Sequence, residues 1–159
     1  MNEKIHHLEE LNNELSLALG KAVWAFAMIE KLMFEYMKQL SRDDLPDLIG
    51  YQSISKRIEI IKKLINRIEG LDSEKQQALN RIAQIQELSN SRNQIAHWPW
   101  LIWIDLEERV FKTEIQDLQN KNKAPIDKKK IKEFTEKAGE LASDLEIALI
   151  PLAKAVRGF

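Results

Sequence analysis

The sequence predicts an all-α fold: an up-down helical bundle of four main helices with a short β-hairpin inserted after the third. Three observations lead to this prediction. Apolar residues recur at 3-4 spacing over several long stretches, which gives each of these stretches one apolar helical face. The 159 residues include only five glycines and four prolines, so few positions interrupt a helix. A single stretch near residue 100 instead alternates residues that favour β-strands.

The first helix is predicted from an apolar seam over residues 8–36. A second apolar row joins this seam from about residue 19 and extends the helix to Leu40, so its later half should lie at the centre of the bundle. Glu30 interrupts that apolar surface. Aspartates, a proline and a glycine then predict a loop over residues 41–50.

The second helix is expected over residues 53–69, with Gly70 as its terminator and Arg57 among the basic residues on its outside. A third helix, capped by Asp72 or Ser73, becomes polar towards residues 91–100. Alternation over 100–104 and 109–115 predicts the hairpin. The last helix spans about 127–156, and Pro151 should bend it or end its regular part.

Composition limits the function classes. The net charge of −1 provides no overall positive field, so any contact with a polyanion has to be local. The absence of cysteine excludes disulfides, thiolate metal ligands and cysteine nucleophiles. Three histidines without metal-ligand spacing predict neither a metal site nor a cofactor. No secretory signal and no membrane-spanning stretch is visible, so a cytoplasmic protein without membrane contact is expected.

Residues 91–100 contain the candidate site. Pro99 disfavours helical geometry at the residue before it, so His97 should lie in the last helical turn. Arg92 and His97 are then offset by about 140° and about 7.5 Å along the axis. Asn93 lies one turn before His97 on the same face. Two potential cations with an amide between them, at an exposed helix end, are suited to binding a phosphate.

The segment Arg92-Asn93-Gln94-Ile95-Ala96-His97 resembles the R-x4-H signature of the HEPN superfamily, a group of helical bundles rich in prokaryotic ribonucleases. The layout is similar as well, with an early helix that includes residues 22–30, the motif at the end of a later helix, and one long final helix. Many members have a glycine soon after the histidine, whereas this chain has Trp98-Pro99-Trp100.

The resemblance implies that residues 1–159 form a single HEPN-like domain, a metal-independent endoribonuclease. It implies a homodimer in which two motifs face each other, with RNA and not DNA as substrate. A toxin or phage-defence role, with an antitoxin protein as a further partner, would suit such an enzyme. The resemblance leads to the hypothesis that His97 acts as general base or acid, Arg92 as phosphate clamp, and Asn93 as the group that orients His97 or the substrate.

Other features have both a functional and a structural interpretation. Glu30 either supports the site or is a partly buried partner for a basic residue such as Arg92. Trp98 and Trp100 either stack RNA bases or pack the hairpin and an interface.

Three lysines lie at the start of the last helix: Lys128, Lys129 and Lys130. They either bind along the phosphate backbone of RNA or are solvated side chains without a ligand. For the whole chain, the alternatives to an enzyme are a non-catalytic module that binds RNA, a nucleotide or a partner protein, and a purely structural helical dimer.

Overall fold

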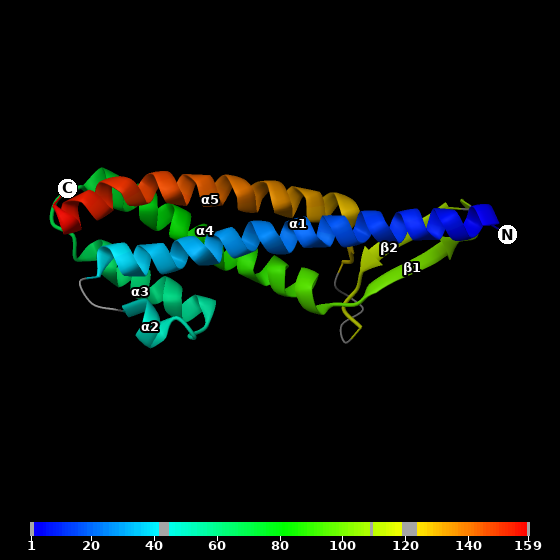
Figure 1. The fold of residues 1–159 in the computed structure, drawn as a ribbon, viewed down its shortest axis with the longest axis horizontal. Coiled ribbons are helices and arrows are strands. Elements are labelled where there is room, and N and C mark those ends of the chain that lie inside the picture. The colour runs from blue at the N-terminus through cyan, green and yellow to red at the C-terminus, as the bar shows by residue number, and fades with distance from the viewer. Residues whose placement is uncertain (1, 42–44, 109, 119–123, 159) are drawn as a thin grey trace.

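The computed structural model describes residues 2–41, 45–108, 110–118 and 124–158. These residues are mostly helical, as predicted, with a small antiparallel sheet after the third of the long helices (Figure 1). The long helices are α1 (Asn2–Leu40), α3 (Ile54–Asn66), α4 (Asp72–His97) and α5 (Lys128–Arg157). In the described part of the chain, none of the helices combines the length and the apolarity needed to cross a bilayer.

Helix α1 packs against each of the other long helices and most extensively against α5. Its 39 residues give it a length of about 58 Å. In Figure 1 its carboxyl half lies among the other helices, whereas its amino half runs alongside the hairpin. The ring centroids of His7 and Phe111 are 5.5 Å apart, which joins the start of α1 to the hairpin.

The predicted apolar seams form the core. The fully buried side chains of α1 are Ala22, Phe26, Ile29, Met33, Tyr36 and Met37. The buried side chains of α5 are Ile131, Phe134, Ala138, Leu141, Leu145, Leu149 and Leu152. Both sets follow 3-4 spacing, so each helix buries one face against its neighbours.

The hairpin consists of β1 (Trp100–Asp105) and β2 (Val110–Ile115), which pair antiparallel with Trp100 opposite Ile115. The carboxylate of Asp105 accepts hydrogen bonds from the backbone N–H groups of Glu107 and Glu108, both at 3.0 Å, which stabilises the turn. The predicted hairpin is confirmed, although Arg109 lies outside the described residues. A third strand, β3 (Ile126–Asp127), pairs with β2 and is too short to leave a sequence pattern.

The structure corrects the predicted loop and the next two helix boundaries. A short helix, α2 (Leu45–Ile49), lies within the predicted loop 41–50, of which residues 42–44 are outside the described part. Helix α3 ends at Asn66, before the predicted residue 69. Leu71 holds a left-handed conformation (φ 54°) at the N-cap of α4, so neither Asp72 nor Ser73 occupies the cap position.

Helix α5 continues through Pro151 to Arg157, so of the two alternatives the one in which the proline ends the regular part is wrong. The alternative in which Pro151 bends the helix stays a prediction. Proline removes one backbone hydrogen bond, but Leu149 and Leu152 on either side are buried in the core, and their burial stabilises the helix. At the other end Asp127 caps α5, because its side chain accepts a hydrogen bond from the N–H of Lys130 at 2.8 Å.

Stability should depend on pH through Tyr36. This side chain is fully buried, its hydroxyl donates to the carbonyl oxygen of Leu145 at 2.9 Å, and burial raises the pKa of Tyr36. A tyrosine in the unfolded chain loses its proton at about pH 10, while folded Tyr36 keeps its proton at that pH. The free energy of unfolding should therefore fall as the pH rises above about 10.

Urea unfolding at a series of pH values up to about 11 measures this slope. Tyr36→Phe should flatten it, whereas Tyr51→Phe, at an 82% exposed position, should keep the wild-type slope. Equal slopes for Tyr36→Phe and the wild type would contradict the assignment.

Candidate functional site

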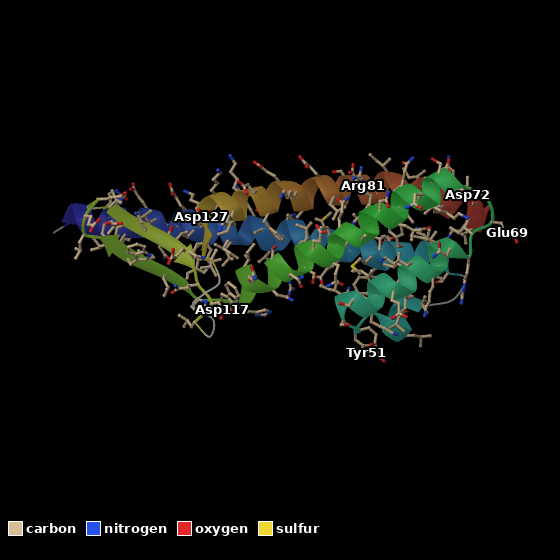
Figure 2. The ribbon with its side chains drawn as sticks, turned by 180° about the vertical axis from the view of Figure 1, so that it is seen from behind. Tyr51, Glu69, Asp72, Arg81, Asp117 and Asp127 are labelled. Carbon is tan, nitrogen blue, oxygen red and sulfur yellow. The ribbon has the colours of Figure 1, made fainter. Side chains whose placement is uncertain are left out.

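The carboxyl end of α4 contains the residues of the motif. Trp98 adopts an extended conformation (φ −86°, ψ 143°), as expected before a proline, and its N–H donates to the carbonyl oxygen of Gln94 at 3.0 Å. His97 is therefore the last residue of the helix, as predicted, and its side chain is exposed. Figure 2, with Asp72 and Arg81 labelled on the first half of α4, shows this helix running from there towards the hairpin.

Arg92 is half-buried against α1. Its guanidinium carbon lies 5.8 Å from the ring centroid of Phe26, within the range of a cation–π contact. Phe26 in turn stacks on Phe134 of α5, with ring centroids 6.3 Å apart and an interplanar angle of 23°. The guanidinium thus lies on an aromatic pair that joins α1 to α5. Phe26 belongs to the second apolar row that the sequence predicts for the first helix, but no contact between that row and the motif was predicted.

Asn93 contacts Arg92. The Nη1 atom of Arg92 donates to Oδ1 of Asn93 at 3.2 Å, and Asn93 itself is exposed. Among the described residues no hydrogen bond joins Asn93 to His97, although the two are one helical turn apart. No carboxylate in the described ranges forms an ion pair with Arg92. Among the residues that the structure describes, the guanidinium is therefore positioned by neutral groups.

Glu30 pairs with Arg57 and not with Arg92. The Nη2 atom of Arg57 lies 3.1 Å from Oε1 of Glu30, and its guanidinium carbon is 5.3 Å from the centroid of the Phe34 ring. Only 6% of Arg57 is exposed, so the expectation that it lies on the outside of its helix is wrong.

The sequence does contain a signal for this burial. Arg57 follows Ile54 by three residues and precedes Ile61 by four, which places it on the apolar face of α3. Its Nε atom is buried without an acceptor among the described residues, so Glu30 provides the hydrogen bond that the structure gives this guanidinium. Glu30 therefore stabilises the packing of α1 on α3, one turn away from Phe26.

The two tryptophans next to the motif pack against the core. Trp98 and Trp100 are both half-buried and contact core side chains, as the packing interpretation expects. Trp103 on β1 is more exposed, and Nζ of Lys112 lies 5.8 Å from its ring centroid. Of these three rings, Trp103 offers the most surface to a ligand.

The predicted lysines at the start of α5 lie apart from the motif. Lys128 forms an ion pair with Glu14 of α1, and this contact lowers the pKa of Glu14. Lys130 donates from Nζ to the carbonyl oxygen of Pro125 at 2.9 Å. Lys129 is exposed and, like Lys128, lines a hollow between α1 and α5 that neither Arg92 nor His97 lines.

The described residues include no group of three or more His, Asp or Glu side chains arranged to hold a metal ion. The chemistry available at the end of α4 is that of a guanidinium, an amide and an imidazole.

The Glu30–Arg57 pair should be strongly coupled. Because Arg57 is buried, Glu30→Ala should leave an uncompensated charge and lower the free energy of unfolding by about 3 kcal/mol. A double-mutant cycle with Glu30→Ala and Arg57→Met, followed by urea unfolding, measures the coupling. The control is the more exposed pair Arg81–Asp144, at 3.0 Å, whose coupling should stay below about 1 kcal/mol. Equal couplings for the two pairs would argue against a buried interaction.

No family model, no curated protein and no solved structure matches this chain.

Proposed function

We propose that this protein is a metal-independent endoribonuclease of the HEPN type, with a composite active site formed by the α4 ends of two identical copies. One observation carries the proposal. The guanidinium of Arg92 is held by Phe26 and Asn93, has no carboxylate partner among the described residues, and precedes an exposed imidazole by five residues. A cation and a proton-transfer group, brought to the same phosphate, are suited to phosphodiester cleavage.

The orientation of the two side chains supports a homodimer. Arg92 packs inward on α1, whereas His97 is exposed at the end of the helix, and five residues of helix separate them by about 140°. A single copy therefore directs the two groups to different sides. A second copy, placed with its α4 end opposite the first, supplies an imidazole at the solvent-exposed edge of the half-buried guanidinium.

The reaction uses the nucleophile that RNA itself provides. One His97 accepts the proton of the ribose 2′-hydroxyl, and the oxygen attacks the adjacent phosphorus. Arg92 donates hydrogen bonds to the non-bridging oxygens and stabilises the charge of the phosphorane. The second His97 protonates the departing 5′-oxygen, so the products carry a 2′,3′-cyclic phosphate and a 5′-hydroxyl. DNA lacks the nucleophile and is not a substrate.

The proposal includes the finer features that the resemblance implies. The four long helices are interpreted as an up-down bundle of one HEPN-like domain, supported by the packing of α1 on α3, α4 and α5. A cytoplasmic toxin or phage-defence enzyme, restrained by an antitoxin protein, is the biological setting that suits this chemistry.

Cleavage of a fluorescent RNA in the presence of EDTA tests the activity. His97→Ala and Arg92→Ala should each lower the rate at least about 100-fold, because each removes a proton-transfer group or the phosphate clamp. His7→Ala and Arg81→Ala are matched controls, since both residues lie away from the end of α4 and should leave the rate unchanged. An RNA with a single 2′-deoxy sugar at the cut site should resist cleavage there.

The homodimer is tested on the same samples. Light scattering should give the mass of two chains, and the rate per chain should fall on dilution below the dimer dissociation constant. A monomer that cleaves RNA would exclude the composite site. A chain that binds RNA without cleaving it, and loses binding in Arg92→Ala, would instead identify the non-catalytic module.

A further inference from the structure

The outer surface between α1 and α5 is hollowed along most of its length. Three adjoining hollows, of about 550, 680 and 410 Å³, follow the line along which the two helices pack. They reach from Glu14 to Gln39 of α1, a length of about 38 Å. In Figure 1 this line faces the viewer, with α4 behind it. We call this surface the α1–α5 groove.

The middle of the groove has two helical glycines, Gly20 of α1 and Gly139 of α5. A Cβ atom added at either position would meet, beyond its own helical backbone, no atom of the described residues within 4 Å, so their packing does not require glycine there. Glycine in a helix interior is destabilising relative to alanine. The missing side chains deepen the groove and allow another backbone to approach α1 and α5 closely.

The wall of the groove on α1 is apolar and exposed. Trp24 is 71% exposed and Leu17 is 60% exposed, and both line the hollow that contains the glycines. Met28 follows Trp24 by one helical turn and lines the same hollow. Together they form an apolar stripe on the helix that otherwise supplies most of the core.

Lysines dominate the charges on the rim. Six lysines of the described ranges line the groove: Lys21, Lys31, Lys128, Lys129, Lys132 and Lys154. Three glutamates of the same ranges line it: Glu14, Glu35 and Glu146. Lys21 and Lys31 form no ion pair with any carboxylate in the described part of the chain. The groove is thus an apolar channel whose rim carries more lysines than glutamates. Three of these lysines, Lys128, Lys129 and Lys132, lie at the start of α5, where each also pairs with a glutamate, and Lys21 lines the same hollow from α1.

We propose that the α1–α5 groove binds an acidic amphipathic helix of a partner protein. The apolar face of that helix packs on Trp24 and Leu17, its backbone approaches the glycines, and its carboxylates pair with the lysines of the rim. A second copy of this chain does not fit, because two lysine rims would face each other. A single aromatic side chain in an apolar floor is also a poor platform for successive RNA bases.

The proposal does not depend on the nuclease assignment. Neither Arg92 nor His97 lines any of the three hollows. A partner helix in the groove therefore leaves the end of α4 accessible, and the two proposals are tested by different variants.

Fluorescence anisotropy with designed peptides tests the groove. The probe is a labelled helical peptide of about 20 residues, with leucines at 3-4 spacing and glutamates flanking them. The comparison peptide carries lysine in place of each glutamate, and a labelled single-stranded RNA of about 20 nucleotides serves as a third probe. The acidic peptide should bind at least about tenfold more tightly than the lysine peptide, and more weakly as salt is raised.

Substitutions locate the binding. Gly139→Leu fills the floor at a position with open space around it, so the chain should still fold and the acidic peptide should bind about tenfold more weakly. Ala83→Leu makes a similar change at an exposed position of α4 and should leave the affinity unchanged. Lys21→Glu should weaken the acidic peptide and strengthen the lysine peptide.

Three results would overturn the proposal. The first is an acidic peptide that binds no better than its lysine counterpart, or equally well to Gly139→Leu. The second is an RNA whose binding, unlike that of the peptide, is lost in Gly139→Leu, which would make the groove a nucleic-acid site. The third is a change of molar mass in Gly139→Leu, which would make the groove a contact between copies of this chain.

Discussion

Burial of the apolar seam of α1 against α5 removes the largest side chains of the core from water, and the position of the candidate site follows from it. Phe26 belongs to this seam and is almost fully buried, yet its ring is also the surface on which Arg92 rests. The stacking of Phe26 on Phe134 fixes that ring between the two helices. Any change that shifts α1 along α5 therefore also shifts the guanidinium.

Two arginines from different helices converge on neighbouring turns of α1. Arg92 of α4 contacts Phe26, and Arg57 of α3 pairs with Glu30 one turn later. A buried ion pair contributes little net stability compared with an apolar pair of the same size, but it disfavours arrangements that separate the charges. We infer that the Glu30–Arg57 pair fixes the register of α3 on α1, while the cation–π contact orients the end of α4.

Much of the fold could be predicted from periodicity alone. The seams on α1 and α5 are buried as expected, and the alternation after Pro99 corresponds to a hairpin. Periodicity assigns a residue to a face but does not identify its neighbour on the next helix. The contact of Arg92 with Phe26 was therefore not foreseen. Helix α2 has only five residues, too few to establish a period.

The positions of the candidate residues on α4 could be predicted from the sequence, but the side chains that they contact could not. Pro99 and the polar end of α4 correctly placed His97 at the helix terminus. Asn93 lies one helical turn from His97, as expected, but its amide oxygen accepts a hydrogen bond from Arg92, because the long arginine side chain reaches the adjacent residue. Arg57 was judged by its charge, although its spacing from the isoleucines of α3 placed it inside. A charged side chain costs free energy to bury, and the sequence alone did not show that Glu30 of α1 provides the opposite charge for Arg57.

The length of α1 affects which parts of the molecule unfold together. Residues 6–10 are all exposed, and Leu15 is the first α1 residue whose described side chain is buried. The turns before Leu15 remove little apolar surface from water and are tied to the hairpin by contacts such as that of His7 with Phe111. We therefore infer that one continuous helix unfolds in two units. Its first turns are expected to exchange their amide protons with solvent together with the hairpin, while the part beyond Leu15 is expected to exchange only when the whole core unfolds.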